Sequence, residues 1–179
     1  EIEVFIGYER GTVPLRATPA FVRRPEDVER LIWDVTCENN LVTFLNRYKG
    51  KKVGIMVKGC DSRAIVGLLQ EGQLQRENLR IVGVNCPGVI DVKRVAELLD
   101  MPVEDIDDAT LADDSILVRG RRIDWKVALF DLCRACVYHN PEIADTRLGP
   151  AIDDTPTGDP YAQVREMEAL DADARWERT

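Results

Sequence analysis

Residues 53–72, VGIMVKGCDSRAIVGLLQEG, decide the fold of this 179-residue chain. The first five residues form a continuous apolar run, which is typical of a parallel strand buried on both faces. From Ser62 the apolar residues follow helical spacing as far as Gly72, so a helix follows the strand. Residues 79–85, LRIVGVN, repeat the buried-strand pattern, and residues 86–100 indicate a loop and a second helix. This β-α-β-α order predicts a parallel pair of strands in an α/β fold.

The flanking segments predict further strands. Residues 1–9 alternate apolar and polar side chains, as expected of a strand. Residues 115–130 alternate in the same way around a Gly120-Arg121 turn and predict a β-hairpin. Residues 10–24 contain two prolines and are expected to form a loop. Helices or turns are predicted for residues 25–34, 40–50 and 132–145. We therefore expect an α/β fold: a small mixed sheet with a parallel βαβ core, an added β-hairpin and cysteine-bearing loops at the strand ends.

The last part of the chain differs in composition. Residues 149–160, GPAIDDTPTGDP, are typical of a linker, and residues 161–176 are weakly amphipathic, which predicts a solvated or docking helix. Residues 142–179 contain ten acidic and four basic residues, so this segment supplies −6 of the net charge of −8. We therefore expect a domain of residues 1–148, followed by an acidic linker and docking helix of residues 149–179.

Charge and composition also exclude some classes of protein. An acidic chain is a poor partner for nucleic acid, because phosphate binding needs a basic surface. No apolar stretch approaches the ~18 residues of a membrane span. No secretory signal is visible, although the chain begins at Glu1, as expected of a processed chain or a piece of a longer polypeptide. Five cysteines, an odd number, do not indicate a disulfide framework, so a reducing cytoplasm is the simpler setting.

Four of the cysteines form a pattern. Cys60 and Cys86 each follow a buried strand, and adjacent parallel strands end at the same edge of a sheet, about 5 Å apart. Ligands of open α/β sheets bind beyond this edge. Cys133 and Cys136 form a CxxC, whose spacing lets two thiolates bind one metal centre. Four thiolates fit a 4Fe–4S cluster or a four-cysteine zinc site, and the single CxxC favours the cluster. The alternative is that these are buried cysteines without a ligand.

The remaining candidates have simpler interpretations. Cys37 is interpreted as a small core residue, and His139 as a residue at the surface or near the metal centre. Covalent haem is not expected, because Val137 and not histidine follows the CxxC directly. A catalytic role of Cys60 has no support, because a phosphatase loop needs arginine where Val66 lies. His139 is also the single histidine available to activate a thiol.

The residues around Cys60 have a structural and a functional interpretation. Asp61 and Ser62 are preferred helix caps, which explains them without a ligand. Arg63 is disfavoured in a first helical turn, so it indicates an anion or an acidic partner there. Lys58 adds a second positive charge, and Gly59 allows close approach of the backbone. Lys58, Gly59, Ser62 and Arg63 are therefore candidates for binding a cofactor phosphate.

Three segments together indicate a family. VKGCDSRAIVGLLQE, then IVGVNCPGVID, then LCRACVYHNPEIAD resembles the beta-subunit family of coenzyme F420 hydrogenases and dehydrogenases. The chain looks closest to the iron–sulfur branch associated with heterodisulfide-reductase-like complexes of anaerobes. The resemblance extends from Glu1 to about Asp145 and includes the N-terminal segment GYERGTVPLRATPAFVRRPEDVERLIWDVTCENNLVTFL.

The resemblance implies a redox domain that holds a 4Fe–4S cluster and, in well-understood members, an FAD. The cluster ligands implied by the motifs are Cys60, Cys86, Cys133 and Cys136. Lys58, Gly59, Ser62 and Arg63 would line the cofactor side of the same loop. The extra ferredoxin-type cysteine runs of many relatives are absent from this sequence, so further clusters are expected in partner subunits.

Two functions follow from the sequence. The first is a cytoplasmic electron-transfer subunit of a multi-subunit anaerobic oxidoreductase, with other iron–sulfur or flavin subunits as partners. The second is a zinc-stabilised docking subunit without redox chemistry, which the short chain and its acidic tail would suit.

Overall fold

The fold is organised around a six-stranded sheet with the order β2-β1-β4-β5-β9, in which β3 also pairs with β1. The computed structural model describes residues 1–112, 114–154, 159 and 161–178. The strands are β1 (Val4–Arg10), β2 (Ala17–Val22), β3 (Leu31–Ile32), β4 (Val53–Val57), β5 (Leu79–Val84) and β9 (Thr146–Leu148). Strands β1, β4, β5 and β9 are parallel, whereas β2 and β3 are antiparallel to β1. The predicted mixed sheet with a parallel core is confirmed.

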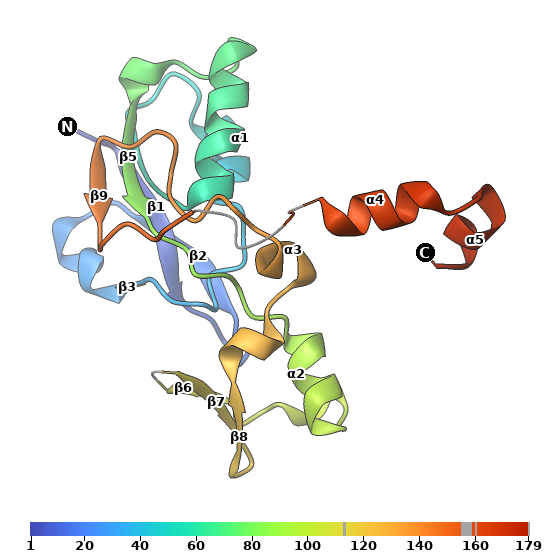
Figure 1. Cartoon of the computed structure of the whole chain (residues 1–179). Helices are drawn as coiled ribbons and strands as arrows, with labels where there is room; N and C mark the ends of the chain where they lie inside the picture. Colours follow the sequence, from blue (N-terminus) through green and yellow to red (C-terminus); the bar gives the residue numbers. More distant parts are fainter. Residues whose placement is uncertain (113, 155–158, 160, 179) are drawn as a thin grey trace.

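The central β-α-β unit forms as its pattern predicts. All five residues of β4 are buried, as expected for a strand with a continuous apolar run. Helix α1 (Gly59–Gln70) joins β4 to its parallel neighbour β5, and α2 (Val92–Leu99) follows β5. Val57 pairs with Gly83, so both strands end at one edge of the sheet (Figure 1). Helix α1 begins three residues before the predicted Ser62, which places Cys60 in its first turn.

A second, antiparallel sheet contains the predicted hairpin. Strands β6 (Thr110–Ala112), β7 (Ser115–Val118) and β8 (Arg121–Asp124) pack with α2 around a separate apolar core. The hairpin turn lies at Arg119-Gly120, where both residues have positive φ. The second hairpin strand was predicted to reach Phe130, but β8 ends at Asp124 because that side chain caps the 3-10 helix η5 (Trp125–Ala128).

The N-terminal third differs most from the prediction. Residues 10–24 were expected to be a loop, yet they contain β2, whose Pro19 is tolerated because β2 is an edge strand. The helix predicted over residues 25–34 is a 3-10 helix, η1 (Pro25–Arg30), followed by β3. The helix predicted over residues 40–50 is also a 3-10 helix, η2 (Leu41–Tyr48). Its apolar face packs into the main core beside β4 and α1.

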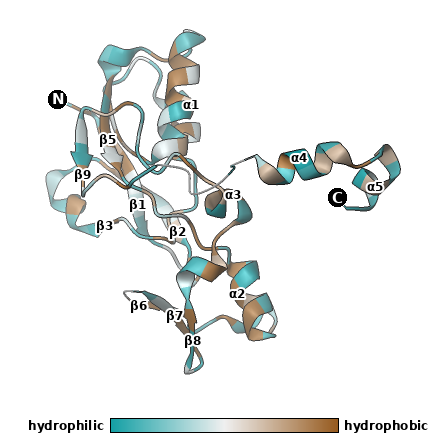
Figure 2. Ribbon diagram, viewed as in Figure 1, coloured by the Kyte–Doolittle hydropathy of each residue, from teal (hydrophilic) through white to brown (hydrophobic). Residues whose placement is uncertain are grey.

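The remaining helices include the tail. They are η3 (Arg76–Asn78), η4 (Val103–Asp105), α3 (Asp131–Arg134), α4 (Ala162–Ala169) and α5 (Ala172–Glu177). The single helix predicted over residues 161–176 is divided, because Leu170 is extended and the Asp171 side chain caps α5. Helices α4 and α5 project away from the sheet, and polar and apolar residues alternate along α4 (Figures 1 and 2). Residues 155–158 and 160 of the predicted linker lie outside the described residues.

In the described part of the chain, no helix combines the length and apolar character needed to cross a bilayer.

Candidate metal centre

Cys60 is presented by the first turn of α1. Lys58 is the N-cap residue, and its carbonyl oxygen accepts a hydrogen bond from the Ser62 N–H at 2.9 Å. Asp61 completes a capping interaction, because its Oδ2 accepts from the Lys58 backbone N–H at 3.5 Å. The predicted capping role of Asp61 is confirmed, although it caps from the third helical position. Cys60 is thereby fixed at the positive end of a 12-residue helix.

The Lys58 side chain is buried under this turn. Its Nζ donates to Tyr8 Oη at 2.7 Å, to the Asn39 carbonyl oxygen at 2.7 Å and to Asp61 Oδ2 at 3.0 Å. The Tyr8 hydroxyl also donates to the Asn39 carbonyl oxygen. Lys58 is 4% exposed and Asp61 is fully buried, so all three ammonium protons have acceptors within the chain. Lys58 therefore has no proton left for a cofactor phosphate in this arrangement.

An isolated antiparallel bridge joins the segment before the CxxC to the loop that follows Cys86. Ile90 pairs with Leu129, and the Phe130 N–H donates to the Val89 carbonyl oxygen at 3.0 Å. Helix α3, which contains Cys133, follows directly. On the other side of the CxxC, the Cys86 N–H donates to the His139 carbonyl oxygen at 2.9 Å. The loop after β5 is therefore held between the two sides of the CxxC segment.

One face of α1 holds the segment that follows the CxxC. A Cβ atom on Gly59 would lie 1.9 Å from the Tyr138 carbonyl oxygen, so only glycine permits this approach. Ser62 Oγ accepts from the Glu142 N–H at 2.8 Å and donates to the Gly59 carbonyl oxygen at 2.7 Å. The Arg63 guanidinium lies 4.0 Å from the centroid of the Tyr138 ring. Three of the four residues predicted to line a cofactor therefore position the CxxC segment against α1.

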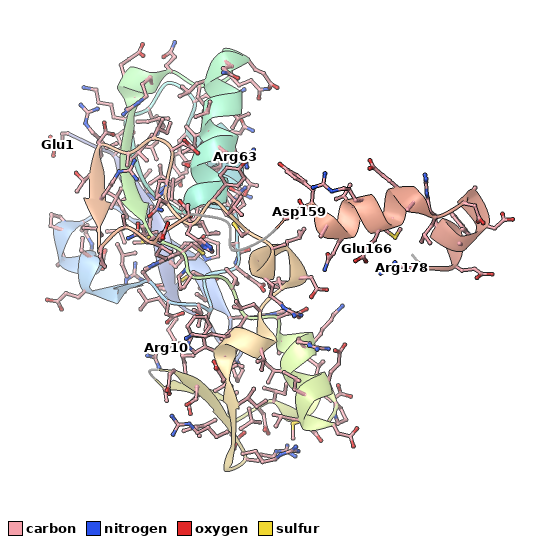
Figure 3. All side chains as sticks on the ribbon, in the orientation of Figure 1. Glu1, Arg10, Arg63, Asp159, Glu166 and Arg178 are labelled. Atoms are coloured by element: carbon pink, nitrogen blue, oxygen red, sulfur yellow. The ribbon has the colours of Figure 1, made fainter. Side chains whose placement is uncertain are left out.

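Arg63 keeps an exposed charge. It lies near the N-terminal end of α1, on the side of the molecule from which α3 and the tail emerge (Figure 3). The predicted cofactor role of Lys58, Gly59, Ser62 and Arg63 stays a prediction. Of these four residues, Arg63 is the one whose charged side chain is exposed to solvent.

Each of the four sulfurs of the pattern faces a backbone amide. Tyr138 N–H donates to Cys136 Sγ at 3.4 Å. Three further backbone hydrogen bonds lower the thiol pKa of their acceptors, from Asp61 to Cys60, from Gly88 to Cys86 and from Val89 to Cys133. Gly88 has a φ of +122°, a conformation that favours glycine. Amide donors stabilise thiolates, which are the form that binds a metal. The donor set therefore fits a thiolate-bound centre.

Burial nevertheless opposes the ionisation of three of these thiols, Cys60, Cys86 and Cys133. It is the main reason why the pKa values of Cys60 and Cys133 are raised, and it raises the pKa of Cys86 to about 12. Neighbouring thiolates add to the effect, since Cys60 and Cys133 both act on Cys86. Because a metal displaces the thiol protons, metal affinity should rise with pH.

Alkylation of the metal-free protein tests the raised pKa of Cys86. Because the thiolate is the nucleophile, the rate at Cys86 should rise about tenfold per pH unit across pH 7–9.5, with no plateau. An ordinary thiol with a pKa of about 8.5 would level off in this range. The measurement is iodoacetamide labelling followed by peptide mass spectrometry, with a free cysteine peptide as the control. A plateau at Cys86 below pH 9 would contradict the raised pKa.

The cysteines do not converge as ligands of one ion. In the described residues, no three His, Cys, Asp or Glu side chains are close enough to hold a single metal ion. The sulfurs around a tetrahedral zinc ion would lie within about 4 Å of one another. Cys37 is fully buried, and burial raises its pKa to about 12. Its interpretation as a core residue agrees with this position.

Several contacts around the site were not predicted from the sequence. His139 Nδ1 donates to the Cys86 carbonyl oxygen at 2.7 Å. Asp154 accepts from the His139 N–H at 2.7 Å and from Asn140 Nδ2 at 2.5 Å. The start of the acidic tail is thus attached to the segment that follows the CxxC. Nothing in the local sequence signals these contacts, because the partners lie 14 to 53 residues apart.

Comparisons with known proteins agree with the predicted resemblance. No protein-family model matches the chain. The F420-dependent formate dehydrogenase 1 subunit beta of Methanococcus maripaludis is 26% identical over 102 residues, which are 56% of this chain and 26% of the relative. The match therefore spans about a quarter of that relative. A solved structure of the F420-reducing NiFe hydrogenase complex from Methanosarcina barkeri contains a similar fold, with a TM-score of 0.60 and 14% identity. That match covers 86% of this chain and 60% of the other. The sequence match supports the F420 hydrogenase and dehydrogenase beta-subunit family, and the structural match shows a shared fold.

Proposed function

We propose that this chain is an electron-transfer subunit of a multi-subunit anaerobic oxidoreductase and holds one 4Fe–4S cluster through Cys60, Cys86, Cys133 and Cys136. The observation that supports the proposal is that Cys60 and Cys86 follow paired parallel strands at one edge of the sheet, while backbone hydrogen bonds join the CxxC segment to the loop after β5. A 4Fe–4S cluster supplies one-electron transfer at a potential that depends on burial and on such amide donors.

The distribution of the cysteines over the fold favours a cluster over zinc. Structural zinc sites commonly use two CxxC-type pairs, whereas this chain has one CxxC, and Cys60 and Cys86 come singly from α1 and from the loop after β5. The chain's contribution is to hold Cys60 on α1, Cys86 after β5, and the CxxC around α3 in fixed relation to one another.

The partners would be other iron–sulfur or flavin subunits, and FAD is proposed as the group that exchanges electrons with the cluster. The sequence relative is named as a subunit of an F420-dependent formate dehydrogenase, and the protein of similar fold comes from an F420-reducing hydrogenase complex, which supports a complex here. Leu132, next to Cys133, is 88% exposed, as expected of a residue that a partner covers. Residues 149–179 are proposed as an acidic docking arm, because α4 and α5 extend from the body and expose Tyr161 and Val164.

Metal analysis of anaerobically purified protein tests the function. We expect about four irons and four sulfides per chain, together with a brown absorbance that bleaches on reduction. Flavin extraction from the same sample tests the FAD. We expect the protein in the reducing cytoplasm, where the free thiols would persist. One zinc per chain without iron would instead support the docking subunit, and a protein without metal would contradict both.

A further inference from the structure

We propose that the first residues of the tail belong to the cysteine site, and that Asp154 and Asn140 are positioning residues for Cys86. We call the four hydrogen bonds that join residues 139–140 to residues 152–154 the latch. The inference rests on the proposed function and deepens it, because a centre shared by four cysteines needs Cys86 and the CxxC in a fixed relation. It also extends the site into residues that the sequence predicts as a linker.

Asn140 and Asp154 provide the side-chain groups of the latch. Asn140 Nδ2 donates to the Ile152 carbonyl oxygen at 2.6 Å and to Asp154 Oδ2 at 2.5 Å. Asn140 Oδ1 accepts from the Ile152 N–H at 3.0 Å, and Asp154 Oδ1 accepts from the His139 N–H at 2.7 Å. Both oxygens of the Asp154 carboxylate therefore have a donor from the segment after the CxxC. Hydrogen bonds to a carboxylate are stronger than bonds between neutral groups, so Asp154 should contribute most to the latch.

The burial of the first tail residues agrees with these contacts. Ile152 and Asp154 are half-buried, whereas Ala151 and Asp153 are exposed. This alternation is typical of an extended chain that lies with one side against the protein, because successive side chains point in opposite directions. A linker that only tethered the later helices would have no reason to alternate. Residues 151–154 therefore lie along the body of the domain.

His139 connects the latch to Cys86. The His139 carbonyl oxygen accepts from the Cys86 N–H at 2.9 Å, and His139 Nδ1 donates to the Cys86 carbonyl oxygen at 2.7 Å. Asp154 holds the N–H of the same histidine. Cys86 lies in a loop outside any helix or strand, so its backbone depends on such contacts for its position. Hydrogen bonds therefore lead from Asp154 through His139 to both sides of Cys86.

Alkylation of the metal-free, full-length protein at fixed pH tests the latch. In Asp154→Leu, the donors from residues 139 and 140 lose their acceptor, and the segment should open locally around Cys86. We expect the alkylation rate of Cys86, followed by peptide mass spectrometry, to rise about tenfold, the factor expected for the loss of one hydrogen bond to a charged group. Cys37 should keep its rate, because it is fully buried in the main core and reacts when the whole domain unfolds. A variant that only destabilised the fold would accelerate both cysteines by the same factor.

Exchanging the two side chains supplies a rescue. Asn140→Asp alone places a second carboxylate against Asp154, so it should accelerate the alkylation of Cys86. In the double variant of Asn140→Asp and Asp154→Asn, the new amide can donate to the new carboxylate, which can still accept from the Ile152 N–H. The new amide also keeps an oxygen for the His139 N–H. The rate at Cys86 should therefore return toward the wild-type value, although the double variant contains both changes.

Asp159→Leu is the matched control within the tail. The Asp159 side chain accepts from the Tyr161 N–H at 2.9 Å and from Arg165 Nε at 2.9 Å, so these partners belong to the tail itself. Asp159 lies at the start of the projecting helices (Figure 3). The change removes the same carboxylate from the acidic tail without altering the latch. The alkylation rates of Cys86 and Cys37 should both stay at their wild-type values.

The outcomes separate this inference from the proposed function. Acceleration at Cys86 without acceleration at Cys37, and recovery in the double variant, support the latch. Equal factors at the two cysteines, or a Cys86 rate in Asp154→Leu no higher than in Asp159→Leu, would overturn it. If Asp154→Leu does not fold, a double variant that reacts no more slowly than Asn140→Asp would overturn it. If the wild-type protein takes up no iron, the proposed function fails, and the alkylation rates still decide whether the latch holds Cys86.

Discussion

Replacing Cys133 by serine should abolish metal binding. Cys133 lies in α3 and accepts a hydrogen bond from the Val89 amide, so its sulfur faces the loop that contains Cys86. A serine hydroxyl is a poor ligand for iron, and three thiolates would remain. We expect the iron content after anaerobic reconstitution to fall from about four per chain to less than one, with loss of the brown absorbance. Cys60→Ser, Cys86→Ser and Cys136→Ser should behave in the same way.

Cys37→Ala is the matched control for this series. Cys37 is fully buried in the main core and does not belong to the four-cysteine pattern. We expect the Ala variant to keep its full iron content and to lose about 1 kcal/mol of unfolding free energy through the smaller side chain. Iron and sulfide assays should be read beside circular dichroism of each variant. Full iron in Cys133→Ser, or none in Cys37→Ala, would show that the ligand assignment is wrong.

Local patterns predicted those parts of the fold that depend on neighbouring residues. The apolar run Val53–Val57 is typical of a strand buried on both faces, and its helix and parallel partner followed from the order of the patterns. Strand β2 was missed because Pro19 looks like a strand breaker, and only its place at the sheet edge removes the objection. Strand β9 is three residues long and exposed, so it carries no pattern of its own.

The strand-end positions of Cys60 and Cys86 were predicted from the sequence, but the contacts that hold the surrounding residues were not. The pairing of β4 with β5 brings the ends of both strands to one edge of the sheet. The contact of Lys58 with Tyr8 joins residues fifty positions apart, and that of Ser62 with Glu142 joins residues eighty apart. Such pairings depend on the packing of the whole domain. Polar residues beside Cys60 were therefore interpreted as a cofactor cradle, whereas the contacts of Lys58 and Ser62 lie within the chain.

Gly59→Ala should cause a large loss of stability. The added Cβ would lie 1.9 Å from the Tyr138 carbonyl oxygen and 2.8 Å from its carbonyl carbon, and both belong to backbone that cannot turn aside as a side chain can. The segment after the CxxC would have to move away from α1. That movement would strain the hydrogen bond from the Glu142 N–H to Ser62 Oγ and the stacking of Arg63 on Tyr138. We expect a loss of about 3 kcal/mol in the free energy of unfolding.

Gly67→Ala separates this effect from the general consequence of placing alanine in α1. Gly67 lies in the same helix, and a Cβ there would meet no atom within 4 Å. Because alanine favours helix and glycine disfavours it, this variant should gain about 0.5–1 kcal/mol. Urea denaturation of the metal-free, reduced proteins measures both changes without any contribution from a bound centre. Equal stabilities of the two variants would show that α1 does not depend on the close approach of Tyr138, and Cys60 would then lack the fixed relation to Cys136 that a shared centre requires.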